Sequence, residues 1–61
     1  MKLTLTINLG DDAMQTGNDL AGALRSVATL FEERLPHGVG SGAQGIIRDM
    51  NGNTVGSWEV L

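Results

Sequence analysis

Only one stretch of this chain has the length and the apolar spacing of a full helix, and it lies between Thr16 and Pro36. Thr16, followed three residues later by Asp19, is a variant of the capping box that begins many helices. Pro36 forces the residue before it out of helical geometry, so we predict that the helix ends at Leu35. Because one helix covers only one face of a sheet, any sheet in this chain keeps a face without helical cover.

Within this segment, apolar side chains recur at spacings of three and four residues and form one stripe along the helix. Polar side chains fall on the opposite side. We therefore predict that the stripe packs against a sheet. The stripe consists of Leu20, Leu24, Val27, Phe31 and Leu35, and the opposite side carries Arg25, Thr29, Glu32 and Glu33.

Three other segments have the pattern of strands. Residues 2–9, KLTLTINL, alternate apolar and polar side chains, as in a strand with one buried and one wet face. Residues 44–49 and 53–60 form two short strands around a turn. The order strand, helix, strand, strand predicts a single α+β domain over residues 1–61, with one helix packed on a three-stranded antiparallel sheet. We expect the first strand to pair with the last, which gives the strand order 1-3-2.

An oxygen-rich cluster, Asp49-Met50-Asn51-Gly52-Asn53, connects the last two strands. Asp49, Asn51 and Asn53 have the spacing of the first ligands of an EF-hand calcium loop. However, the glycine comes too early for such a loop, and Val60 stands where the loop needs a glutamate. Only one of these side chains is charged, whereas calcium binds several carboxylates. The cluster therefore favours a hairpin turn over a metal site.

Two turn geometries fit this cluster. In a three-residue loop, Met50 and Asn51 form the centre of a type I turn and Gly52 is the left-handed residue of a bulge. A two-residue type I′ turn at Asn51-Gly52 is the alternative, and it shifts the strand register by one residue. The bulged turn predicts the opposing pairs Asp49–Asn53, Ile47–Val55, Ile46–Gly56 and Gln44–Trp58.

The register decides which side chains the helix covers. With the bulged turn, we expect the helix to cover the face that carries Trp58 and Val60. Ile47 and Val55 then form an apolar spot on the open face, and such spots often mark partner sites. Trp58 is a candidate interface anchor, although it competes only with Phe31 as the main core aromatic, which favours a place in the core.

Other residues with chemical potential do not form a convergent site. His37 lies in a glycine-rich loop and is expected to be solvated, as are the adjacent carboxylates Asp11 and Asp12. A G-x-G-x-x-G match follows a helix and leads into a strand, which is the reverse of the order that binds dinucleotides. The serines have no visible base for a hydrolytic triad. We therefore expect no catalytic residue, no metal and no cofactor.

Charge and composition also limit the partners. The net charge is −3, and the four basic residues are scattered as Lys2, Arg25, Arg34 and Arg48, which argues against nucleic-acid binding. No apolar run approaches the ~20 residues of a membrane span, and the N-terminus alternates too regularly for a signal peptide. The absence of cysteine suits the cytoplasm. We expect a cytoplasmic protein that binds neither nucleic acid nor a membrane.

Two segments carry a resemblance: IRDMNGNTVGSWEV (47–60) and LTINLGDDAMQT (5–16). With them, the chain resembles a group of short uncharacterised proteins of actinobacteria and their bacteriophages. The resemblance brings no activity and no site residues. It implies a small accessory protein of a phage or prophage, in the bacterial host cytoplasm.

These observations favour a binding function over catalysis. The first hypothesis is a small non-enzymatic protein that binds a host or phage protein, with Ile47, Val55 and Trp58 as candidate contacts. The second is a structural homo-oligomer, such as a virion or assembly component. A chain this short buries little core, so we also expect a weak homodimer, in which two sheets pair face to face or two edge strands pair side by side.

Overall fold

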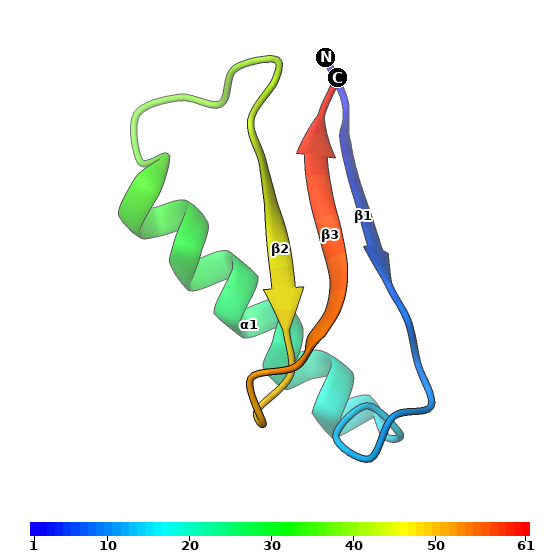
Figure 1. The fold of residues 1–61 in the computed structure, drawn as a ribbon. Coiled ribbons are helices and arrows are strands. Elements are labelled where there is room, and N and C mark those ends of the chain that lie inside the picture. The colour runs from blue at the N-terminus through cyan, green and yellow to red at the C-terminus, as the bar shows by residue number, and fades with distance from the viewer.

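The chain folds as a strand, a helix and a hairpin, and the computed structural model describes all 61 residues. The elements are β1 (Leu3–Ile7), α1 (Gly17–Arg34), β2 (Gln44–Arg48) and β3 (Thr54–Val60). The strands form one antiparallel sheet in the order β1-β3-β2, and α1 runs diagonally across one face of it (Figure 1). The predicted βαββ fold with strand order 1-3-2 is confirmed. The helix is not long and apolar enough to cross a membrane.

The ends of α1 are where the sequence predicts them. Thr16 is the N-cap, and its hydroxyl accepts a hydrogen bond from the Asp19 backbone N–H at 3.1 Å. The Asp19 carboxylate in turn accepts from the backbone N–H groups of Thr16 and Gln15, at 3.2 and 3.0 Å. The capping box is therefore complete, with an aspartate in the place of the usual glutamate. Leu35 is the C-cap, directly before Pro36.

We expect Thr16→Ala to lower the stability of the fold, because it removes the acceptor for an otherwise unpaired N–H of the first turn. The loss should be ~0.5–2 kcal/mol, or roughly 4–8 °C in Tm per kcal/mol for a domain of this size. Thermal melting followed by circular dichroism measures it. Thr29→Ala, on an exposed position in the middle of the helix, is the matched control and should be neutral or slightly stabilising. Equal losses in both variants would contradict the capping role.

The buried stripe of α1 is rotated slightly from the predicted one. Ala23 and Val27 are the buried residues of the helix. Leu24 was predicted to face the sheet, but 42% of its surface is exposed, so this prediction is wrong. The physical reason is that successive residues lie about 100° apart around a helix, so the side that buries Ala23 and Val27 turns Leu24 toward solvent. The partly buried helix residues that pack on the core are Leu20, Leu30, Phe31 and, at the C-cap, Leu35.

The turn of the hairpin has the predicted three-residue geometry. The Gly52 N–H donates to the Asp49 carbonyl at 3.1 Å, the Asp49 N–H donates to the Asn53 carbonyl at 2.9 Å, and Gly52 has a φ of 83°. Asn51 has a negative φ, since no residue other than glycine has a positive one, which excludes the type I′ alternative. The predicted pair Asp49–Asn53 is therefore confirmed.

Beyond the turn, the predicted register is wrong. Arg48 pairs with Thr54, but Ile47 pairs with Gly56, so Val55 is an extra residue on β3. This β-bulge places Ile47, Val55, Trp58 and Val60 together on the face that α1 covers. The predicted pairs Ile47–Val55, Ile46–Gly56 and Gln44–Trp58 are replaced by Ile47–Gly56, Ile46–Ser57, Gly45–Trp58 and Gln44–Glu59.

The bulge also inverts the predicted faces of β2. Ile47 and Val55 were predicted to lie on the open face, but each is only 1% exposed and belongs to the core. Ile46 points the other way and is 50% exposed. The open face consequently has one exposed isoleucine instead of a pair of aliphatic side chains. Burying Ile47, Val55, Trp58 and Val60 together under one helix gives a larger core than the uniform register would.

Candidate functional site

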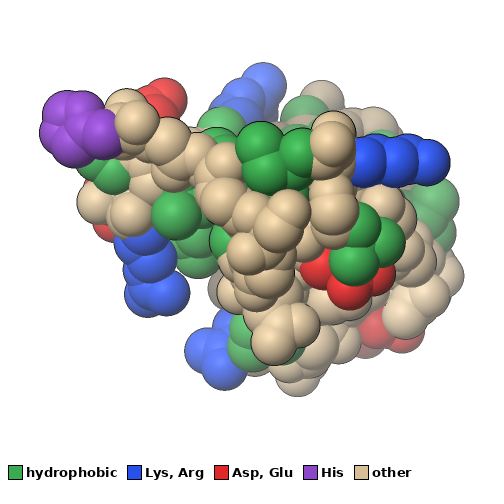
Figure 2. Space-filling model, turned by 90° about the horizontal axis from the view of Figure 1, so that it is seen from above, with side chains coloured by type: hydrophobic (Ala, Val, Ile, Leu, Met, Phe, Trp, Pro, Cys, Tyr) green, Lys and Arg blue, Asp and Glu red, His purple; other side chains and the backbone are tan.

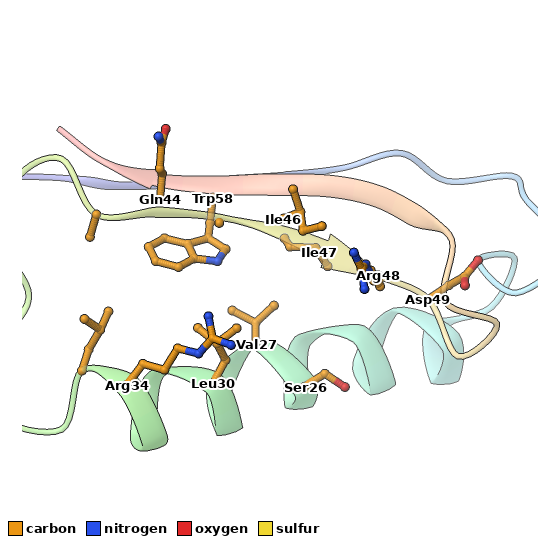
Figure 3. Close-up of a pocket in the computed structure, with 13 residues that line it drawn as sticks. Ser26, Val27, Leu30, Arg34, Gln44, Ile46, Ile47, Arg48, Asp49 and Trp58 are labelled. Carbon is orange, nitrogen blue, oxygen red and sulfur yellow. The ribbon is translucent and has the colours of Figure 1, made fainter.

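A groove with a volume of about 560 Å³ lies between α1 and β2. β2 is an edge strand, so the groove opens along the side of the sheet (Figures 1 and 3). We call it the α1–β2 groove. Its apolar lining comes from both elements and from β3, and includes Val27, Leu30, Leu35, Ile47 and Trp58.

Trp58 forms the part of the groove that β3 contributes. Its ring stands edge-on to Phe31, with centroids 4.9 Å apart and planes at 89°, and only 5% of the residue is exposed. The prediction that Trp58 is a core residue is therefore confirmed. The ring packs over Gly45 of β2, where an added Cβ would lie 2.6 Å from the indole nitrogen. Only glycine leaves room there for the indole.

The indole N–H of Trp58 is a buried donor that no group of the chain accepts. Figure 3 shows the ring extending from the sheet into the groove, with its nitrogen on the side that faces α1. A buried donor without an acceptor costs about 1–3 kcal/mol. Such exceptions are rare in folded proteins. The N–H thus provides a hydrogen-bonding point in an otherwise apolar part of the groove.

The outer side of β2 carries main-chain groups that no strand covers. The Val60 N–H donates to the Ala43 carbonyl at 2.8 Å, and hydrogen-bonded and non-hydrogen-bonded pairs alternate along an antiparallel ladder. Gly45 and Ile47 therefore bond to β3. The N–H and C=O groups of Gln44, Ile46 and Arg48 point away from the sheet, and we call this row the β2 edge. Such an edge is a template for an added strand.

Two arginines lie at the groove. Arg34 comes from the last turn of α1 and Arg48 from the end of β2, and both line the groove. Both are exposed, and neither guanidinium donates a hydrogen bond to another group of the chain. The single acidic residue in the lining is Asp49, although the whole chain has a net charge of −3. Seen from above, the basic side chains are separate from one another and form no stripe (Figure 2).

The oxygen-rich cluster of residues 49–53 forms and stabilises the hairpin turn. One carboxylate oxygen of Asp49 accepts from the backbone N–H groups of Asn51 and Asn53, each at 2.9 Å, and its other oxygen is buried without a partner. Asp11 and Asp12 lie on the same side of the molecule and line a shallow polar hollow with it. No three side chains among His, Cys, Asp and Glu come together to hold a metal ion. The hairpin interpretation accounts for the hydrogen bonds of the cluster.

The residues selected from the sequence are only partly brought together. Ile47 and Trp58 line the groove from the sheet. Val55 is buried in the core and does not line the groove. His37 is exposed, and its imidazole projects at one extremity of the molecule (Figure 2). The sequence analysis did not predict the groove. Its one signal was Gly45, an isolated glycine in a strand, which indicates a close approach by another group.

In comparisons with known proteins, no protein-family model, no curated protein and no solved structure matches the chain.

Proposed function

We propose that this chain is a small non-enzymatic accessory protein of a phage or prophage that binds another protein. It does so by accepting an extended segment of its partner as an additional strand at the β2 edge. Side chains of that segment enter the α1–β2 groove. The phage context rests on the resemblance of the two end segments, and the mode of binding rests on the groove.

The observation that carries the proposal is the unpartnered indole N–H of Trp58 in a groove beside an open strand edge. In strand addition, the main chain of the edge provides affinity and the pockets for alternate side chains provide specificity. Both features are present side by side here. Main-chain groups of Gln44, Ile46 and Arg48 are free to pair, and the apolar side chains of α1 line the space next to them.

The change Ile46→Pro tests this mode of binding. Proline removes the N–H of residue 46, which points outward, and its ring blocks the edge, but no hydrogen bond to β3 is lost. We expect the retention of the partner to fall about tenfold or more, since both pairing and access are impaired. The measurement is affinity capture from a bacterial lysate, with the bound proteins quantified by mass spectrometry.

Leu3→Pro is the matched control at the opposite edge of the sheet. Leu3 is 49% exposed, against 50% for Ile46. Its N–H also points outward, because the neighbouring Lys2 is the residue paired with Leu61. Leu3→Pro should retain the partner like the parent, and circular dichroism must show both variants folded. Equal retention by parent and Ile46→Pro, or no protein enriched by the parent, would contradict the proposal.

A further inference from the structure

We infer that the segment received by the α1–β2 groove is acidic: an extended peptide with carboxylates at its ends and small apolar side chains between them. This inference rests on the proposed function, because it specifies the chemistry of the strand that the β2 edge would accept. Three features of the groove support it, namely the charge of its rim, the form of its apolar lining and the donor in its wall.

The charge of the rim is opposite to that of the protein. Arg34 and Arg48 line the groove from its two sides, whereas the chain as a whole carries a net charge of −3. Asp49, the one acidic residue of the lining, directs an oxygen to the two turn amides. Because neither arginine has a partner within the chain, an incoming carboxylate does not have to displace one. Guanidinium groups bind carboxylates with paired hydrogen bonds, and opposite charges also accelerate encounter.

The same charge distribution disfavours a second copy of this chain as the occupant. Self-pairing of β2 would bring Arg48 and Arg34 of both copies to one shared interface. An acidic segment of a different protein avoids this repulsion between arginines.

The apolar lining of the groove determines which side chains can lie between the carboxylates of the bound segment. Val27 and Leu30 of α1 face Ile47 and Trp58 of the sheet across the groove (Figure 3). A strand beside β2 directs every second side chain into this space, and aliphatic side chains fit it. The buried indole N–H of Trp58 needs an acceptor, and a main-chain carbonyl or a threonine hydroxyl of the bound segment can provide one.

Titration with defined peptides tests the inference directly. The probe is the acetylated and amidated octapeptide Glu-Glu-Val-Thr-Val-Thr-Glu-Glu, with serine or lysine replacing every glutamate in two comparison peptides. Trp58 is the only tryptophan, so its fluorescence and the NMR signal of its indole N–H report occupation of the groove. We expect the glutamate peptide to bind roughly tenfold more tightly than the serine peptide, to lose this advantage at high salt, and to shift the indole proton downfield.

Charge reversal on the protein provides the matched pair. Arg34→Glu should weaken binding of the glutamate peptide about three- to tenfold and leave the serine peptide unaffected. Arg25→Glu changes the net charge equally on an exposed helix position outside the groove. It should have less than about a twofold effect, because an exposed charge that does not line the groove makes no direct contact with the peptide and is weakened by salt.

The peptide titrations and the lysate capture together distinguish a failure of the acidic preference from a failure of strand addition. Equal affinity for the glutamate and serine peptides, both lost in Ile46→Pro, would overturn the acidic preference and leave strand addition standing. Binding of no peptide, with no partner captured from lysate, would overturn both. A dimer of the free protein that Ile46→Pro dissociates would also overturn the inference, since a second copy would then fill the groove.

Discussion

Gly56→Ala is expected to unfold the protein. Gly56 lies in β3 opposite Ile7 of β1, and a Cβ at this position would overlap the carbonyl oxygen of Thr6. It would also lie 2.9 Å from the Cα of Ile7. All the atoms in conflict belong to the backbone of β1, so no rotamer change relieves the contact, and β1 would have to leave the sheet. Native domains are stabilised by only ~0.05–0.15 kcal/mol per residue, so a chain this short cannot lose a strand and remain folded.

Two other glycine-to-alanine changes serve as comparisons for Gly56→Ala. At Gly45 the added Cβ would meet the indole of Trp58, a side chain that can shift, so Gly45→Ala should cost a smaller ~1–3 kcal/mol. At Gly22, in the middle of α1, nothing lies within 4 Å of the added Cβ. Gly22→Ala should therefore stabilise the helix by roughly 0.5–1 kcal/mol. Urea denaturation followed by circular dichroism ranks the three variants. A Gly56→Ala protein as stable as the parent would show that β1 and β3 do not approach this closely.

The sequence predicts the parts of this fold that depend on local chemistry. The alternation in residues 2–9, the Thr16 cap, Pro36 and the Asp49–Asn53 turn each involve neighbouring residues only, and each is confirmed. The strand order followed from how few connections one helix and one hairpin allow. The ends of the strands differ by one or two residues from the prediction, since β1 is Leu3–Ile7 and β2 ends at Arg48.

The face of the hairpin could not be predicted, because it depends on tertiary packing. A uniform ladder from Asp49–Asn53 leaves Ile47 and Val55 on one face and Trp58 on the other. The bulge at Val55 resolves this conflict by adding a residue to β3, which places Ile47, Val55 and Trp58 on the face toward α1. The glycine that follows Val55 was the only local signal of such an irregularity.

The candidate site was missed for a related reason. The groove lies between α1 and β2, which are separated in the sequence. The spacing of residues along the chain does not specify the angle between these two elements. Met14 illustrates the same limit in the core. It lies outside every helix and strand, and was not singled out from the sequence, but is 1% exposed. Its burial depends on the path of the loop between β1 and α1.

Ile47→Asp is expected to destabilise the protein by more than about 4 kcal/mol, which is enough to unfold it. Ile47 is 1% exposed and lies under α1 beside Val27 and Trp58. Truncating a buried isoleucine alone costs ~2–5 kcal/mol. A carboxylate at this buried place would in addition lose its hydration. The two arginines that line the groove, Arg34 and Arg48, are exposed. Urea denaturation followed by Trp58 fluorescence measures the loss.

Ile46→Asp is the matched control, because it makes the same chemical change one residue earlier in the same strand. Ile46 is 50% exposed and points to the open face, so its replacement should change stability by no more than about 0.5 kcal/mol. Since a shift of one residue exchanges the two faces of a strand, the pair of variants reads out the register directly. Without the bulge, Ile46 would be the buried residue and Ile47 the exposed one, and the two results would be reversed. A folded Ile47→Asp protein together with an unfolded Ile46→Asp protein would therefore disprove the bulge, and with it the position of the α1–β2 groove.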